Sequence, residues 1–451
     1  MIELRPELLI PQNFQNSSLE MTNKDTFTNH LNRINSAPAW LLDLKRASWD
    51  KFVSTSMPKH TDDTWRFTNT KNLNLNKYHQ ISDIKSIKKE SLEEQSNQLN
   101  LISGKIVFVD DHQCRDTEFD TELKEKGVIW TTLEDAFLNH HDLIKKYVTG
   151  KLPNLGAEKF GSLHHSLMTN GTFLYIPQGI EIDLPFIVYN WTSTMGMAVF
   201  PHTIIITDKY AKVNLVSFFK SMDPNIQNLA ISCSNIYAGI GSQITFTAVQ
   251  DWNLKTQSYH LNTANADQDA NIKNININVG SAYMRHEHHT QMFGLGSKTD
   301  TYSLSLTTGE QEFDQRSLQT HSAPNTNSDL LFKNTLLDSS RTIFSGLIRV
   351  NENAQKTDAY QTNRNLLLSE SAEANSLPGL EILADDVKCS HGATSGRLDD
   401  NQIFYLLSRG ITKKTAQQLM VFGFLEEIID KLDNQDLANR VRDIIRKKLP
   451  K

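Results

Sequence analysis

Short apolar runs separated by turn residues fill the chain from about residue 154 to residue 397. Many of them alternate apolar and polar positions, which is the period of a strand with one buried face. Gly, Asn, Asp or Pro stands in nearly every gap, as in turns. The spacing permits a sandwich, a barrel or a stacked solenoid, and no repeat period chooses among them. The predicted strands are Thr172–Ile176, Phe186–Tyr189, Thr203–Thr207, Lys212–Phe218, Ala230–Tyr237, Gln243–Val249, Asn271–Val279, Tyr302–Leu306, Leu330–Lys333, Thr342–Val350 and Gly379–Leu383.

The region before this β-rich body is predicted to be helical with a small α/β part. Apolar residues of a helix at 39–53 gather on one side, among them Trp49, Phe52 and Val53. Thr132, with Asp135 three residues later, resembles a capping box that opens a short helix. We expect this N-terminal region to span residues 1–153.

The C-terminal region, residues 398–451, is predicted to hold three helices. Asp399 is placed to cap the first helix and Thr412 the second. The second helix is apolar around much of its circumference, which indicates either a second docking face or two-sided packing within a small helical domain. The β-rich body between the two flanking regions then spans residues 154–397.

Composition excludes several classes of function. The chain has 451 residues, 22% of them charged, and a net charge of −6, so no broad basic surface for nucleic acid is expected. The first residues, MIELRPELLIPQNFQ, lack the basic start and apolar core of a signal peptide. No apolar run approaches the roughly 20 residues that cross a bilayer. We therefore expect a cytoplasmic protein without membrane segments.

The cysteines limit the redox and metal chemistry of the chain. Cys114, Cys233 and Cys389 are far apart and form no CxxC motif, so neither a disulfide framework nor a zinc ribbon is expected. The chain alone cannot offer four thiolates to an iron–sulfur cluster.

The candidate site lies in the stretch from Leu377 to Ile411, which is predicted to be a strand, then a Cys-x-His pair at a turn, then a capped helix. In an extended chain the Cys389 thiol and the His391 imidazole point the same way. Together they make half of a soft metal site, and the other ligands would have to come from elsewhere. On the residues alone, a small buried Cys beside a His that caps its own turn is the commoner arrangement.

Two other motifs are weaker. In the stretch Arg285–His289, His286 and His288 share one face of a strand while Glu287 and His289 take the other, which favours a solvated polar strand or turn over a metal site. The stretch Gly294–Thr299 imitates a P-loop, but Ser297 replaces the glycine before the lysine, so we expect no bound nucleotide. His202, before an apolar strand, is interpreted as structural.

The candidate stretch resembles the C-terminal signature of the SufB/SufD family of iron–sulfur cluster assembly scaffolds. Within it, Ser390-His391-Gly392 resembles the SufD branch, because SufB members usually carry Glu where Gly392 stands. The patch Trp65-Arg66-Phe67-Thr68 resembles one near the start of many members, and we interpret it as an aromatic anchor for the N-terminal helices. Further matching motifs are Phe344-Ser345-Gly346, Gln355-Lys356-Thr357-Asp358, Gln361-Thr362-Asn363-Arg364-Asn365, Phe404-Tyr405-Leu406 and Ser408-Arg409-Gly410-Ile411.

The resemblance implies a mainly β fold, with a central right-handed parallel β-helix between the two helical regions. It implies a non-catalytic scaffold that pairs with a SufB-like subunit through the C-terminal part of the β-helix. A SufC-type ABC ATPase would dock on the C-terminal helices and supply the ATPase activity. His391 would face the SufB cysteine, with Cys389 beside it, as ligands of a transient iron–sulfur cluster shared between the subunits.

Two alternatives remain. A homodimeric β-helix protein, with Cys389 and His391 merely packed, would need neither a cluster nor an ATPase, and a homodimer of the isolated chain is compatible with the scaffold as well. A β-helix enzyme acting on polysaccharide would fit the β-rich body, but such enzymes are usually secreted and the chain shows no signal peptide.

Overall fold

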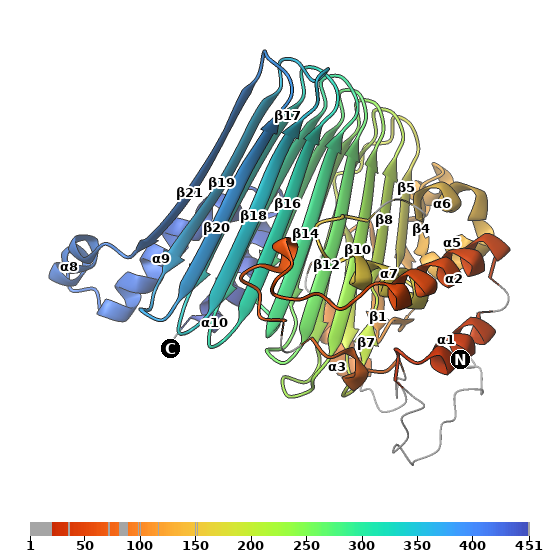
Figure 1. The fold of residues 1–451 in the computed structure, drawn as a ribbon, viewed down its shortest axis with the longest axis horizontal. Coiled ribbons are helices and arrows are strands. Elements are labelled where there is room, and N and C mark those ends of the chain that lie inside the picture. Colours follow the sequence, from red (N-terminus) through yellow and green to blue (C-terminus); the bar gives the residue numbers. More distant parts are fainter. Residues whose placement is uncertain are drawn as a thin grey trace.

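The computed structural model describes residues 20–34, 37–70, 73–80, 89–97, 99, 101–115, 117–148, 150 and 152–449. Two long sheets, mostly parallel, face each other along the body of the molecule (Figure 1). The chain alternates between the sheets, so each coil adds one strand to each, and the fold is a parallel β-solenoid. The prediction of a mainly β protein with a central parallel β-helix is confirmed. The N-terminal residues 1–19, which include the signal-peptide prediction, lie outside the described residues.

From β9 onward, the first sheet carries the odd-numbered strands of the solenoid, and β6 precedes them. Its order is β2-β1-β6-β9-β11-β13-β15-β17-β19-β21, with β3 paired to β1. The bounds are β2 His112–Gln113, β1 Gly104–Val109, β3 Glu118–Phe119, β6 Phe186–Thr192, β9 Lys212–Ser221, β11 Gln243–Asp251, β13 Asn271–Asn278, β15 Lys298–Thr307, β17 Asn327–Leu336, β19 Asp358–Leu367 and β21 Lys388–Arg397.

From β8 onward, the second sheet carries the even-numbered strands, and β4, β5 and β7 complete it. Its order is β20-β18-β16-β14-β12-β10-β8-β5-β4, with β7 paired to β10. The bounds are β20 Glu373–Ile382, β18 Arg341–Val350, β16 Glu312–His321, β14 Tyr283–Met292, β12 Gln257–Ala266, β10 Leu229–Ala238, β7 Ala198–Val199, β8 His202–Thr207, β5 Thr172–Ile176 and β4 Ile129–Thr132.

Side chains of equivalent residues stack from coil to coil because neighbouring strands pair in register. Ser232 pairs with His260, His260 with His286, His286 with Gln315, and Gln315 with Phe344. Every second residue of a strand therefore points into the solenoid. The sequence pattern does not predict β12, β16 or β19, because many of their inward positions are polar and the alternation of apolar residues is lost.

Most of the N-terminal helices cover the outer face of the second sheet at its first coils (Figure 1). The helix Lys89–Ser96 instead packs on the first sheet, where Trp191 Nε1 donates to the Ser96 hydroxyl at 3.1 Å. Leu41, Trp49 and Phe52 of α2 share a core with Phe160 of α7, whereas Val53, expected on the same side, is 62% exposed. The helices of this region are α1 Lys24–Arg33, α2 Ala39–Ser54, α3 Lys89–Ser96, α4 Thr121–Glu125, α5 Leu133–Asn139, α6 His141–Val148 and α7 Glu158–Leu167. Thr132 caps α5 as expected, its hydroxyl accepting from the Asp135 N–H at 3.2 Å.

The C-terminal helices are α8 Asp400–Ser408, α9 Lys413–Ile429 and α10 Gln435–Lys448. Helices α9 and α10 pack on the outer face of the first sheet, where Leu425 and Val441 share a core with Leu304. Helix α8 projects beyond the last coil (Figure 1). The predicted caps are present, since Asp399 accepts from the Asn401 N–H and Thr412 from the Thr415 N–H. No helix in the described part of the chain is long and apolar enough to cross a membrane.

Candidate functional site

Cys389 and His391 lie on β21, the last strand of the first sheet, and not at a turn as the sequence indicated. The strand pairs on one side only, with β19, where Cys389 is the partner of Ala359 and His391 that of Gln361. The pair is therefore extended, and both side chains point to the same side of the strand, as expected. A bend at Asp385 and Asp386 precedes β21.

The Cys389 thiol is half-buried against a small apolar cluster at the end of the solenoid. Ile348, Ala354 and Ala359 belong to this cluster. Burial raises the pKa of the Cys389 thiol, and the carboxylate of Asp358 raises it further. The thiol is therefore held in its neutral form near pH 7, and a metal ion would have to displace its proton in order to bind.

The His391 side chain is exposed, although its partner Gln361 is 1% exposed in the coil before. The difference arises because no further coil covers β21. Nothing in the described residues brings three or more His, Cys, Asp or Glu side chains together in a metal-binding arrangement. Cys389 and His391 are thus two soft potential ligands without a complete metal site around them among the described residues.

The open end of the solenoid around this pair is partly apolar. Strand β20, which ends the second sheet beside β21, exposes Leu377, Leu380 and Ile382 at 37%, 36% and 40%, and Leu383 follows at 53%. Both end strands also leave one backbone edge unpaired in their sheets. Unpaired edges and exposed apolar side chains are features of a surface that another chain covers.

A second exposed apolar surface lies on the projecting helix α8. Phe404, Tyr405 and Leu407 are 71%, 57% and 39% exposed. On α9, Leu419 is 50% exposed although Val421, Leu425 and Ile428 of the same helix are buried against the sheet. Packing on the solenoid, which neither explanation from the sequence included, accounts for most of the apolar circumference of the second helix, and Leu419 remains outside.

Comparison with known protein families shows which family this chain belongs to. The family model described as SUF system FeS cluster assembly, SufBD core domain, matches residues 189–424. The SufBD protein N-terminal region matches residues 17–188. The chain belongs to the SufBD family. The two matches together cover the solenoid, the N-terminal helices and the beginning of the C-terminal helices.

Similar proteins carry the same family names. The iron–sulfur cluster assembly protein SufD of Bacillus subtilis is 28% identical over 417 residues, which is 91% of this chain and 94% of that protein. SufD of Escherichia coli is 28% identical over 406 residues, 89% of this chain and 91% of the relative. An iron–sulfur cluster assembly SufBD family protein of Staphylococcus epidermidis is 25% identical over 311 residues, 69% of this chain and 67% of the relative. This SufBD protein is thus a protein of SUF-type iron–sulfur cluster assembly.

The stretch Arg285–His289 of this SufBD protein is buried, and the expectation of a solvated strand or turn is wrong. On β14, Arg285, His286, Glu287 and His288 are at most 2% exposed. Arg285 donates to Glu287 at 2.8 Å and to Asp314 at 2.6 Å on the outer face. The N-terminal segment covers this face, which the local pattern could not show.

His202 is structural, as interpreted from the sequence. It is 1% exposed and its ring contacts His164 Nε2 at 3.0 Å and Asn235 Oδ1 at 2.8 Å. Burial lowers the pKa of His202 to about 4, so the ring is neutral.

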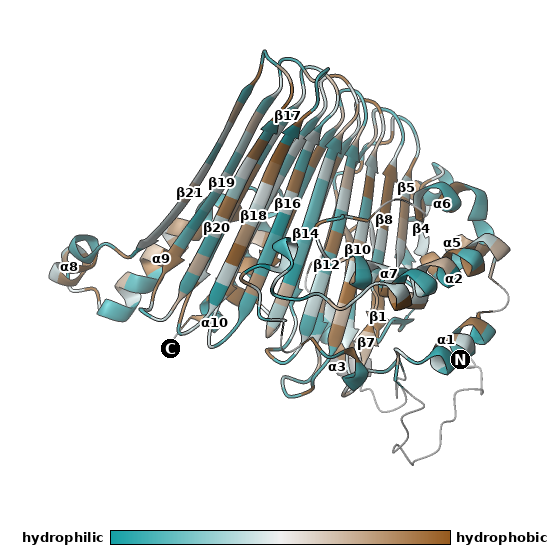
Figure 2. Cartoon of the chain, in the orientation of Figure 1, coloured by the Kyte–Doolittle hydropathy of each residue, from teal (hydrophilic) through white to brown (hydrophobic). Residues whose placement is uncertain are grey.

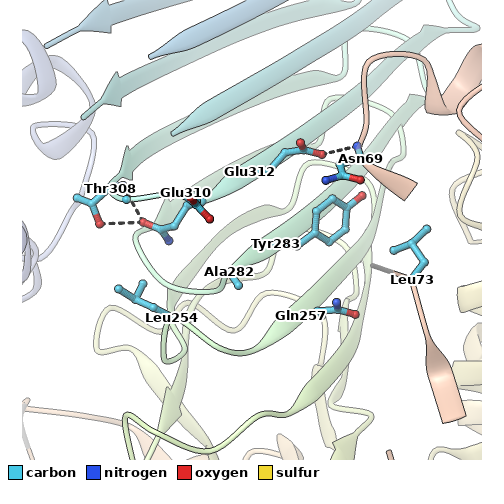
Figure 3. Close-up of a pocket in the computed structure, with 11 residues that line it drawn as sticks. Asn69, Leu73, Leu254, Gln257, Ala282, Tyr283, Thr308, Glu310 and Glu312 are labelled. Atoms are coloured by element: carbon cyan, nitrogen blue, oxygen red, sulfur yellow. Dashed lines mark hydrogen bonds between the residues drawn. The ribbon is translucent and has the colours of Figure 1, made fainter. Parts of the chain in front are cut away.

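A pocket of about 340 Å³ lies on the outer side of the solenoid in the SufBD core, between the N-terminal segment and the turn before β16 (Figure 3). The Glu312 carboxylate accepts from the Asn69 N–H at 2.9 Å, above the ring of Tyr283. The side chain of Gln311 accepts from Thr308. The first bond joins the N-terminal segment to the start of β16, and the bonds to Gln311 close the turn. We assign no ligand to the pocket.

Proposed function

We propose that this protein is a cytoplasmic, non-catalytic scaffold subunit on which an iron–sulfur cluster is assembled together with a SufB-like subunit. The observation that carries the proposal is the position of His391 beside Cys389 on the last strand of an open-ended solenoid. The iron–sulfur cluster is the cargo of this scaffold, and the energy for assembly comes from a SufC-type ATPase partner.

The open end supports pairing with a SufB-like subunit. Its apolar side chains on β20 and its unpaired strand edges offer hydrophobic contact and backbone hydrogen bonds to a partner. A partner seated there would contact the exposed side of His391. The family membership of the chain favours a SufBD protein as that partner.

The chemistry of the pair supports a shared cluster. Imidazole and thiol side chains supply ligands that suit iron, and this chain provides one of each. His391 serves as ligand, and Cys389 as an auxiliary thiol that loses its proton when iron binds. Since the pair is incomplete alone, the cluster forms only when the partner contributes further ligands.

The exposed apolar surface of α8 supports docking of the SufC-type ATPase. Phe404 and Tyr405 are large apolar side chains on a helix that contacts the solenoid body little and projects from it (Figure 1). Because the ATPase docks on this projecting helix, ATP-driven closure of the ATPase moves the two scaffold subunits relative to each other. The movement would open the shared site to iron and sulfur.

The experiment is anaerobic co-expression with the SufB-like and SufC-like proteins of the same organism. Native mass spectrometry reports the complex, and iron and sulfide are assayed on the same sample. We expect a complex of all three proteins with a labile cluster. His391→Ala should assemble the same complex and lose most of the iron and sulfide, whereas Ser390→Ala, on the opposite side of the same strand, should retain both.

Normal cluster content in the His391→Ala complex would remove His391 from the site. A homodimer without partners or iron would instead favour the structural protein, in which Cys389 and His391 are merely packed. The apolar open end is compatible with that arrangement too, and the mass of the complex separates the two.

A further inference from the structure

The interior of the solenoid changes from apolar to polar along its axis. In the first coils, inward residues such as Leu215, Phe246 and Ile205 form a continuous apolar core. From β12 to β19 many inward residues are His, Asn, Gln, Ser or Thr. In Figure 2, which colours the residues of both faces, β8 and β10 are mostly brown whereas β14 and β16 carry long teal stretches.

Part of this polar interior is joined by hydrogen bonds between the two sheets. His288 Nε2 contacts the Thr301 hydroxyl at 3.3 Å, and Gln315 Nε2 donates to the Ser305 hydroxyl at 3.0 Å. Farther along, Gln319 Nε2 donates to a serine of β17 at 2.8 Å. The two inner faces therefore approach each other closely along several coils.

Many inward polar atoms in the same coils have no hydrogen-bond partner among the described residues. Each belongs to a residue that is at most 6% exposed. They are His260 Nε2, Asn274 Nδ2, Asn276 Nδ2, His288 Nδ1, Thr290 Oγ1, Gln315 Oε1, Ser317 Oγ, Gln319 Oε1, Asn334 Oδ1, Gln361 Oε1 and Asn363 Nδ2. A buried polar atom without a partner is unfavourable, and the sum over this set would exceed the net stability of an ordinary domain.

The chemistry of these atoms defines what can satisfy them. Amide nitrogens donate, amide oxygens accept, and hydroxyl groups do both, so the ligand must both donate and accept. The inward positions of β12 to β19 carry no Asp, Glu, Lys or Arg. Burial lowers the pKa of His286 to about 4, and that of His288 is lowered as well, so the imidazoles are neutral. An uncharged lining of donors and acceptors is suited to water.

The row of inward polar residues continues to the open end of the solenoid. Asn334 Nδ2 donates to Asn365 Oδ1 at 2.8 Å, and Asn365 Nδ2 donates to the hydroxyls of Ser376 and Ser395 at 3.2 and 3.1 Å. Ser376 lies on β20 and Ser395 on β21, where Ser395 is exposed. Ser395 is four residues from His391 on the same side of the strand.

We propose that the coils from β12 to β19 enclose a file of ordered water that extends to the open end beside His391. The first coils close the other end of the file with their apolar core. The inner side of the Cys389 and His391 pair then contacts this enclosed water, even when a partner covers the open end. The proposal does not depend on the function proposed above, because it concerns the interior of this chain alone.

The direct test is a crystal structure of the full chain at a resolution that shows ordered water. We expect water within hydrogen-bond distance of Thr290 Oγ1, Ser317 Oγ and Asn276 Nδ2. An interior without such density, with these atoms packed against other protein atoms, would overturn the proposal.

The stability of isosteric variants gives an independent test. In a hydrated interior, Thr290→Val and Ser317→Ala remove a partner of bound water and should each lower Tm by about 2 °C. In a dry interior the same changes remove an unpaired hydroxyl and should raise Tm, which would contradict the proposal. Thr307→Val is the matched control, because its hydroxyl bonds Ser340 at 2.8 Å and its loss lowers Tm in either case.

Discussion

The guanidinium carbon of Arg285 lies 4.0 Å from the centre of the Trp65 ring. The contact joins the N-terminal segment to β14, across a long separation in the sequence. Arg285 Nη2 also donates to the backbone oxygens of Thr64 and Leu155, at 3.0 and 2.8 Å. Trp65 Nε1 donates to the Gly156 oxygen at 2.7 Å. The aromatic anchor expected from the sequence is therefore present, and its partner is a charged residue of the solenoid.

Loss of the Trp65 ring should destabilise the protein strongly. Trp65 is 1% exposed and shares a core with Phe160. Trp65→Ala is expected to lower the free energy of unfolding by about 3–5 kcal/mol, and Trp65→Phe by less. Urea unfolding followed by circular dichroism measures both. Equal stability of Trp65→Ala and the wild type would show that the anchor does not contribute to folding.

Removal of the Arg285 charge should destabilise the protein, because Arg285 forms ion pairs with the carboxylates of Glu287 and Asp314. Arg285→Met leaves Glu287 and part of the Asp314 charge unpaired in a buried site, with an expected loss of about 3–5 kcal/mol. The double variant Arg285→Met with Glu287→Gln should recover part of that loss. If the double variant is no more stable than Arg285→Met alone, the Glu287 carboxylate does not depend on Arg285 to balance its charge.

Buried histidines should make the protein sensitive to acid. Burial lowers the pKa of His202 and His286 to about 4, whereas an unfolded histidine titrates near 6.5. As the pH falls from about 6.5 to about 4, the unfolded chain binds protons that the folded chain does not. The stability that is complete above pH 6.5 is therefore lost over this window, by up to about 3 kcal/mol for one such imidazole.

The measurement is the midpoint of urea unfolding at pH 7.5 and at pH 5. The midpoint should be lower at pH 5, and His286→Asn should reduce the difference between the two. Equal midpoints of the wild type at the two pH values would contradict the assignment of neutral buried imidazoles.

The Cys389 thiol should react slowly with alkylating reagents. Burial raises its pKa, and the charge of Asp358 adds to the effect. Asp358→Asn should lower the pKa and increase the alkylation rate several-fold at pH 7.5, because the thiolate is the nucleophile. Mass spectrometry of iodoacetamide-treated protein reports the rate at Cys389, with Cys114 as the internal reference. An unchanged alkylation rate would show that the charge of Asp358 does not influence the pKa of the Cys389 thiol.

The apolar surface of α8 and that of the open end should bind their partners independently of each other. Phe404→Glu on α8 is expected to weaken binding of the SufC-type ATPase by at least tenfold and to spare pairing with the SufB-like subunit. Ile382→Glu at the open end should do the reverse. Native mass spectrometry of the co-expressed proteins reads out both contacts, and loss of both partners in either variant would argue against separate surfaces.

The sequence by itself determined the local elements where their pattern is unambiguous. Thr132, Asp399 and Thr412 cap their helices as predicted, because a cap depends on a few neighbouring residues. Most strands of the body and the common face of Cys389 and His391 follow from alternation alone. Neither composition nor spacing chose the solenoid over a sandwich or barrel, and only the resemblance of motifs favoured it.

The tertiary structure decided what each polar residue faces. The pattern of Arg285 to His289 is that of an exposed strand, yet the N-terminal segment buries its outer side and the first sheet faces its inner side. In the same way, Cys389 and His391 are accessible only because β21 is the last strand. Burial results from elements that are distant in sequence, and the alternation within one strand carries no information about them.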